Sequence, residues 1–92
     1  MAILDNVKLA LRINSSAFDM ELKPLIEACK SDLRIAGVGV VNEKDAGVVQ
    51  AIILYAKAYF GYNEDCERFR VAYESLRDSL ALSSISGSGA TT

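Results

Sequence analysis

Histidine is absent from this sequence, and so is tryptophan. Histidine is the side chain that most often serves as a general base or a metal ligand near neutral pH. Without it, the Ser-His-Asp and Cys-His nucleophile arrangements and most zinc sites are excluded. The six glycines form neither a dinucleotide-binding turn nor a phosphate-binding loop. We therefore expect no enzymatic activity, no catalytic residue, no metal and no cofactor.

Cysteine is scarce: the chain has only Cys29 and Cys66, and their spacing matches no metal-binding or redox motif. Isolated thiols of this kind usually behave as small hydrophobic side chains on helix faces. We expect both cysteines to be reduced. A structural disulfide between them is the alternative.

Basic residues are not in excess either, because ten Lys and Arg face twelve Asp and Glu, for a formal net charge of −2. A nucleic-acid-binding surface normally needs a concentrated excess of positive charge, so this balance argues against one. No apolar run is long enough to span a bilayer, and the first residues form no basic leader. We expect a soluble protein that is made inside the cell and has no membrane partner.

Apolar residues, by contrast, are plentiful: they make up 51% of the 92 residues, which suits one globular domain. The most apolar stretch is residues 45–60, interrupted mainly by Gln50 and Lys57. A helix that is apolar around most of its circumference is a buried one. We expect this helix to be the centre of the fold.

Three further helices are predicted around the central one. Residues 3–13 and 65–82 carry amphipathic patterns of helical period. A third such pattern starts near Ser16 or Asp19 and runs to about Ile35. With the central helix, these segments predict a bundle of four helices.

Pro24 leaves the start of the second helix open. Ser16 and Asp19 resemble a capping box, which would place Pro24 inside the helix and kink or loosen its first turn. The alternative is a helix that begins at Pro24 itself. Gly37 is predicted to adopt a left-handed conformation after the helix end, and Asp45 is predicted to cap the start of the central helix.

The last ten residues, SSISGSGATT, are small and polar, and they cannot bury enough surface to order themselves. Ile85 is the one side chain there that could anchor on a partner. The predicted fold is therefore all-α: a small four-helix bundle in a single domain of residues 1–83. A disordered, flexible tail is predicted over residues 84–92.

The helical faces also predict which side chains are buried and which are free for contacts. On the central helix, the stripe that contains Gly47 and Leu54 is the least apolar, so Leu54 is either an incidental exposed residue or a subunit contact. The predicted core consists of Leu25, Cys29, Leu33, Ile52, Tyr59, Phe69, Tyr73 and Leu76. The candidate subunit interface consists of Gln50, Leu54, Lys57, Val71 and Leu82.

The order of these segments resembles the small head–tail connector proteins of tailed bacteriophages, also known as phage DNA-packaging proteins. The resemblance covers roughly residues 4–84 and begins with an amphipathic helix, LDNVKLALRI, and an acid-led helix, DMELKPLIEACKSDL. It is carried most by the portion AIILYAKAYFGYNEDCERFRVAYESLRDSLALSS. There, an apolar helix with a lysine and aromatics leads through a Gly-aromatic turn into the final helix.

The resemblance implies a structural role at the head–tail junction of a virion, after assembly in the host cytoplasm. Members of that family form a ring, typically a dodecamer, which docks on the portal and extends the DNA channel. The implied partners are further copies of the chain, the portal protein, and the next neck or tail-completion protein. DNA would pass through the channel without specific binding, which suits a negative protomer. Ile85 is then the candidate for docking the tail on the portal or another partner.

Two other functions stay open at this point. A DNA-binding regulator of the helix-turn-helix type would need a basic recognition helix. The last helix offers Arg68, Arg70 and Arg77, but it balances them with as many acidic side chains. The other possibility is a helical adaptor or inhibitor that binds a host protein.

Overall fold

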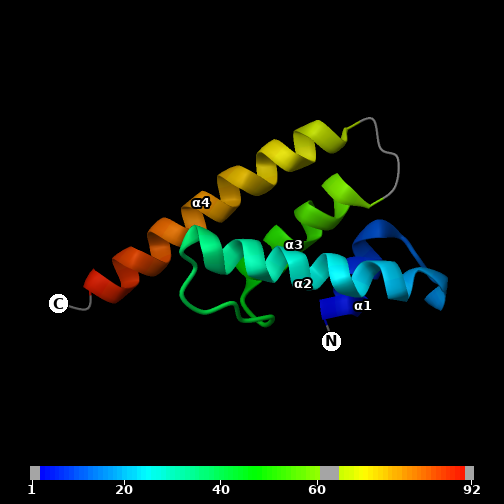
Figure 1. The fold of residues 1–92 in the computed structure, drawn as a ribbon, viewed down its shortest axis with the longest axis horizontal. Helices are drawn as coiled ribbons and strands as arrows, with labels where there is room; N and C mark the ends of the chain where they lie inside the picture. The colour runs from blue at the N-terminus through cyan, green and yellow to red at the C-terminus, as the bar shows by residue number, and fades with distance from the viewer. Residues whose placement is uncertain (1–2, 61–64, 91–92) are drawn as a thin grey trace.

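The described part of the chain contains four α-helices, and Figure 1 shows how they are arranged. This computed structural model describes residues 3–60 and 65–90, with side chains up to residue 82. The helices are α1 (Ile3–Leu11), α2 (Asp19–Ala36), α3 (Ala46–Tyr59) and α4 (Cys66–Ala90), and a 3-10 turn, η1 (Ser16–Phe18), precedes α2. Within those residues there is no strand. The prediction of an all-α, four-helix fold is confirmed.

The chain between α1 and α2 is organised by short-range hydrogen bonds. Arg12 takes the left-handed conformation, with φ 61°, and ends α1. The hydroxyl of Ser15 accepts a 3.0 Å hydrogen bond from the amide of Ala17 and starts η1. The helix α2 begins at Asp19, which is one of the starts predicted from the sequence. The carboxylate of Asp19 does not cap the helix but lies 2.8 Å from the ammonium of Lys8.

Pro24 lies inside α2, in its second turn, so the alternative of a helix that begins at Pro24 is wrong. The kink or loose first turn expected there stays a prediction. The other end of α2 follows the prediction for Gly37. Gly37 has a φ of 113°, and its amide donates a 3.1 Å hydrogen bond to the carbonyl of Arg34. A residue without Cβ adopts this backbone geometry at little steric cost.

Asp45 caps α3, as predicted. Its Oδ1 atom accepts hydrogen bonds from the amides of Gly47, at 2.8 Å, and Val48, at 3.3 Å. These bonds satisfy two of the amides that the first turn of any helix leaves without a carbonyl partner. The side-chain oxygen of Asn42 similarly accepts from the amide of Lys44, at 2.9 Å, and orders the approach to the cap.

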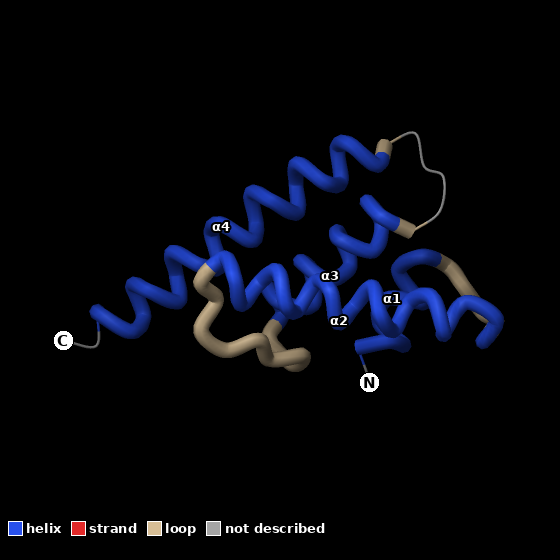
Figure 2. Tube along the Cα trace, viewed as in Figure 1, coloured by secondary structure: helices blue, strands red, loops and turns tan. Residues whose placement is uncertain are grey.

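The helices pack around α3, which contacts all of the other three. In Figure 2, α4 lies along α3 and then continues past the end of α2. The segment between α2 and α3, residues 37–45, is called the connector below, and it loops out beside the place where α4 passes the end of α2. The result is an elongated molecule with extents of 47 × 27 × 18 Å.

Among the side chains that the structure describes, thirteen buried apolar ones form the core, and they come from all four helices and the connector. Among the residues predicted to be there, Cys29, Leu33, Ile52 and Tyr73 are buried, and Leu76 packs against them while partly exposed. The others buried are Ile3, Val7, Leu22, Ile26, Val38, Val48, Ala51, Ala56 and Ala81.

Tyr59 is a correction: its side chain is 51% exposed. It lies in the last turn of α3, where the neighbouring Tyr55 occupies the inner position and packs on Tyr73, with ring centroids 5.1 Å apart. The ring of Tyr59 lies tilted against that of Tyr55, with centroids 4.6 Å apart. Leu25 and Phe69 are two further corrections: they are only partly buried, and they belong neither to the core nor to the apolar side chains that pack against it.

Two further differences concern α4. Its backbone stays helical to Ala90, beyond the end predicted at residue 82, while a flexible tail over residues 84–92 remains a prediction. Cys66 is the first residue of α4 and lies exposed, not buried as a small hydrophobic side chain. Both cysteines are free thiols, as expected, so the alternative of a disulfide is wrong.

Candidate assembly surfaces

The stripe of α3 predicted as a subunit contact is largely covered by α4. A Cβ atom at Gly47 would lie 2.9 Å from Cδ2 of Leu80, and the ammonium of Lys57 lies 5.4 Å from the ring centroid of Phe69. Leu54 is partly buried and packs against the core. Gln50, the remaining candidate on this stripe, is exposed.

This placement has a physical cause that the pattern alone could not give. The stripe is the least apolar side of a helix that is apolar nearly all round, so periodicity favoured solvent there. Gly47 has no side chain, which lets α4 approach closely at that point. Lys57 can lie against an aromatic face while its charge stays near solvent.

On α4, both predicted interface residues are exposed: Val71 by 54% and Leu82 by 67%. They are free for a contact with another molecule. The side chain of Ile85, the candidate for docking the tail, lies outside the described residues.

Other exposed apolar side chains were missed by the sequence analysis. The largest exposures are those of Met20, at 86%, Ile35, at 82%, and Val40, at 77%. Ile35 lies off the helical face that buries Leu22, Ile26, Cys29 and Leu33, so counting its position on the helix could have found it. Val40 lies in the connector, outside the helices, so helical periodicity says nothing about its exposure.

A polar cluster joins α2 to α4 beside the core. The hydroxyl of Tyr73 donates a 2.5 Å hydrogen bond to Oδ2 of Asp32, and Nη1 of Arg77 donates to the same oxygen at 3.3 Å. Burial and this bond to a carboxylate raise the pKa of the Tyr73 phenol. Burial also raises the pKa of the neighbouring Cys29 thiol, to about 12. These groups are held neutral, and their role is to fix the helices.

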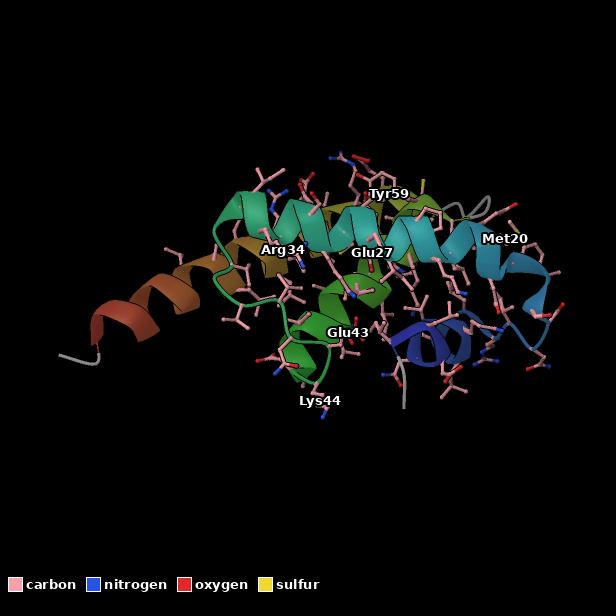
Figure 3. All side chains as sticks on the ribbon, turned by 60° about the horizontal axis from the view of Figure 1, so that its bottom comes forward. Met20, Glu27, Arg34, Glu43, Lys44 and Tyr59 are labelled. Atoms are coloured by element: carbon pink, nitrogen blue, oxygen red, sulfur yellow. The ribbon has the colours of Figure 1, made fainter. Side chains whose placement is uncertain are left out.

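A second cluster fastens the connector to α2. Lys30 is the one buried charged side chain among the described residues, at 9% exposure. Its ammonium bonds Glu43 of the connector and Glu27 one turn away. The hydrogen bond to Glu43 raises the pKa of Lys30. Figure 3 labels Glu27 and Glu43 on the two segments that Lys30 joins.

The arginines of α4 are all paired with carboxylates. Arg68 lies 3.3 Å from Asp65, Arg70 lies 2.9 Å from Glu74 and also bonds Glu67, and Arg77 lies 3.3 Å from Asp32. A phosphate would have to compete with these carboxylates. The described part of the helix therefore offers no basic face for DNA.

The described side chains contain no group of three or more Cys, Asp and Glu that could hold a metal ion. Over residues 3–60 and 65–90, the helices lack the combination of length and apolar character that crossing a bilayer requires. The remaining notable features are the exposed apolar side chains.

A small helical domain with paired charges and exposed apolar side chains is typical of a structural component that functions in contact with other proteins. Comparison with known families makes this specific: the sequence matches the phage connector protein family over residues 3–86. The chain belongs to that family, which is structural, not enzymatic. The resemblance seen in the sequence is thus confirmed. No curated protein sequence and no solved structure matches the chain.

Proposed function

We propose that this protein is a head–tail connector that assembles as a ring on the portal of a tailed phage or prophage. In this role it extends the DNA channel at the head–tail junction and provides a platform for the next neck or tail protein. The observation that carries the proposal is the family match over residues 3–86, which covers α1, α2 and α3 and all of α4 except its last four residues. Assembly would take place in the host cytoplasm.

The exposed apolar side chains support assembly with other proteins. Val71 and Leu82 on α4 would be covered in an assembly, whereas on a free monomer they face water. Covering apolar surface contributes about 25 cal/mol per Å² toward association. A small domain with a modest core gains stability when such surface is buried by a neighbour.

The charge pattern supports a channel through which DNA slides. The arginines of α4 are neutralised by carboxylates within the same protomer, and the net charge is −2. A surface of this kind releases few counterions from DNA and holds phosphates weakly. DNA would therefore pass without specific binding.

The test combines sedimentation velocity with portal binding. We expect the full chain to form concentration-dependent oligomers, alone or on the portal protein of the same phage, and ring-shaped particles by negative-stain electron microscopy. Val71→Glu should weaken assembly if the outer face of α4 is buried in the ring. A chain that stays monomeric at high concentration and does not bind the portal would contradict the proposal.

DNA binding is the competing function to test in the same preparation. A gel shift at low salt should show no complex below micromolar protein, because the arginines of α4 are already paired. Tight binding that weakens steeply with salt would favour the regulator instead.

A further inference from the structure

Two carboxylates from different segments of the chain share the buried ammonium of Lys30. Oε2 of Glu27, one turn earlier on α2, lies 3.2 Å from Nζ of Lys30, and Glu43 of the connector bonds the same nitrogen. Lys30 is buried, whereas the side chains of Glu27 and Glu43 are 68% and 43% exposed. We call these three residues the latch.

The two carboxylates differ in how they are tied to Lys30. Glu27 and Lys30 are three residues apart on one helix, so their contact lasts as long as that turn stays helical. Glu43 is thirteen residues from Lys30 in the sequence, so its contact depends on where the connector lies. When the connector moves away, Lys30 loses one carboxylate and keeps the other. A buried ammonium that keeps a carboxylate avoids the much larger cost of a buried charge without any partner.

The ends of the connector are held independently of the latch. At its start, the amides of Gly37 and Val38 donate hydrogen bonds of 3.1 and 3.0 Å to carbonyls in the last turn of α2, and Val38 is buried. At its end, Asp45 caps α3. Residues 39–44, called the span below, lie between these two fixed points. Within the span, Glu43 bonds α2 through the latch.

We propose that the latch allows the span to lift from α2 while the helices stay packed, with Glu27 as the partner of Lys30 in the lifted state. In the closed state Lys30 has both partners, and Val41 packs against the core. The closed state also brings two carboxylates to one nitrogen, where they repel each other. Lifting relieves this repulsion and leaves Lys30 with Glu27. Salt favours the lifted state, because it screens the contact of the exposed Glu43.

The inference goes beyond the proposed function, since it concerns the movement of one segment within a single chain. A span that lifts in this way changes the surface at the end of α2 without repacking the helices. Every measurement below uses the dilute parent chain and its variants. The results therefore do not depend on whether the protein forms a ring.

Amide exchange with solvent, measured residue by residue by nuclear magnetic resonance, reports the lifting. The reporter is the amide of Lys44, which donates a 2.9 Å hydrogen bond to Oδ1 of Asn42 within the span. The matched control is the amide of Ala17, which donates a 3.0 Å hydrogen bond to Oγ of Ser15. Both are exposed amides bonded to a side chain two residues earlier, and Lys44 is the one that belongs to the span.

The two carboxylates should have opposite effects on this exchange. Glu43→Gln should speed the exchange of the Lys44 amide several-fold, because the charged contact that closes the span is lost. Glu27→Gln should slow it several-fold. Without Glu27, the closed state loses its repulsion, and the lifted state leaves Lys30 with no carboxylate.

Two further measurements separate the latch from local effects on the Lys44 amide. Lys30→Met, which leaves the sequence of the connector unchanged, should act like Glu43→Gln. In the parent chain, exchange at Lys44 should become faster between about 0.05 and 1 M sodium chloride, while exchange at Ala17 stays the same. In Glu43→Gln, this dependence on salt should largely disappear.

Urea denaturation tests the role of Glu27 by a second route. Glu27→Gln and Glu43→Gln each leave Lys30 with one carboxylate, whereas the double variant leaves its buried ammonium with none. The increase of the unfolding equilibrium constant in the double variant should exceed the product of the two single increases about tenfold or more. Adding Lys30→Met to the double variant should restore most of the stability, because no unpaired charge remains.

Three results would overturn the inference. Faster exchange at Lys44 in Glu27→Gln would mean that both carboxylates only fasten the connector. Equal exchange in the parent chain and all variants would mean that the span does not lift through this contact. Losses of stability that simply add, without rescue by Lys30→Met, would mean that Glu27 does not replace Glu43. The proposed function fails on different observations, namely the absence of oligomers and of portal binding.

Discussion

The hydroxyl of Tyr73 donates a 2.5 Å hydrogen bond to Oδ2 of Asp32, across 41 residues of sequence, and this bond ties α4 to α2. Tyr73 is almost fully buried, whereas the side chain of Asp32 is 37% exposed. Replacing the carboxylate would therefore leave a buried hydroxyl with a weaker acceptor. The stability of the packing between α2 and α4 depends on this hydrogen bond.

Asp32→Asn should lower the free energy of unfolding by about 1–2 kcal/mol, because Tyr73 and Arg77 both lose a charged acceptor. Urea denaturation followed by circular dichroism measures the change. Asp78→Asn is the control: Asp78 bonds only its neighbour Arg77 on the outside of α4, so its loss should stay within about 0.5 kcal/mol. Equal losses of stability in the two variants would contradict the claim that the hydrogen bond between Tyr73 and Asp32 stabilises the fold.

The stability of the fold should fall in alkaline solution. The pKa of the Cys29 thiol rises from 9.0 to about 12, and that of the Tyr73 phenol rises above 10.0. The native state then holds these protons more tightly than the unfolded chain. The free energy of unfolding is fully retained below pH 9.0 and falls as the pH rises toward about 12.

Urea denaturation of the parent chain and Cys29→Ala between pH 8 and 11 measures this effect of alkali, with pH values chosen about the ordinary thiol pKa. Cys29→Ala should show a shallower fall with pH, whatever its stability at pH 8. Cys66→Ala, which removes the exposed thiol, should keep the slope of the parent chain. The same slope in both variants would mean that Cys29 does not contribute.

Glu43→Gln should loosen the connector, because Glu43 is the principal partner of the buried ammonium of Lys30. Glu27 remains as a partner, so we expect a loss of about 1 kcal/mol in the free energy of unfolding. Hydrogen exchange should show faster exchange of the connector amides. Lys44→Gln, one residue along, is the control and should change neither quantity.

Leu54→Glu should destabilise the isolated monomer, because Leu54 is partly buried and packs on the core. We expect a loss of about 2 kcal/mol or more, as for other charges forced into packed positions. Val71→Glu, at an exposed position, should change the stability of the dilute monomer by about 0.5 kcal/mol or less. Urea denaturation at low protein concentration measures the stability of both variants. Equal losses would mean that Val71 packs inside the fold of the monomer.

Local rules predicted the backbone of this chain well. Asp45 at the start of α3 and Gly37 at the end of α2 behave as their side-chain chemistry requires, because caps depend on a few neighbouring residues. The four helices follow from apolar periodicity. The end of α4 was missed because small polar residues favour no structure strongly, so composition alone predicted a tail.

Side-chain burial on α3 was harder to predict, for a reason specific to that helix. Nearly every face of α3 is apolar, so its sequence does not say which neighbour covers which face. Tyr59 was assigned to the core and Leu54 to the surface, but the partner helices reach Leu54 and leave Tyr59 outside. The candidate surfaces shared this ambiguity: Val71 and Leu82 were found, while Met20, Ile35 and Val40 needed the structure.

The end of α2 also bears on the direction in which α4 projects. A Cβ atom on Gly37 would lie at an ordinary van der Waals distance, 3.7 Å, from Cβ of Ala81, and beyond Ala81 the helix α4 continues for about 14 Å to Ala90. A small change in the angle between α2 and α4 at this point would be magnified at the end of α4. In a ring built by repeating one contact, as proposed, an angular change in that contact would be added at every subunit.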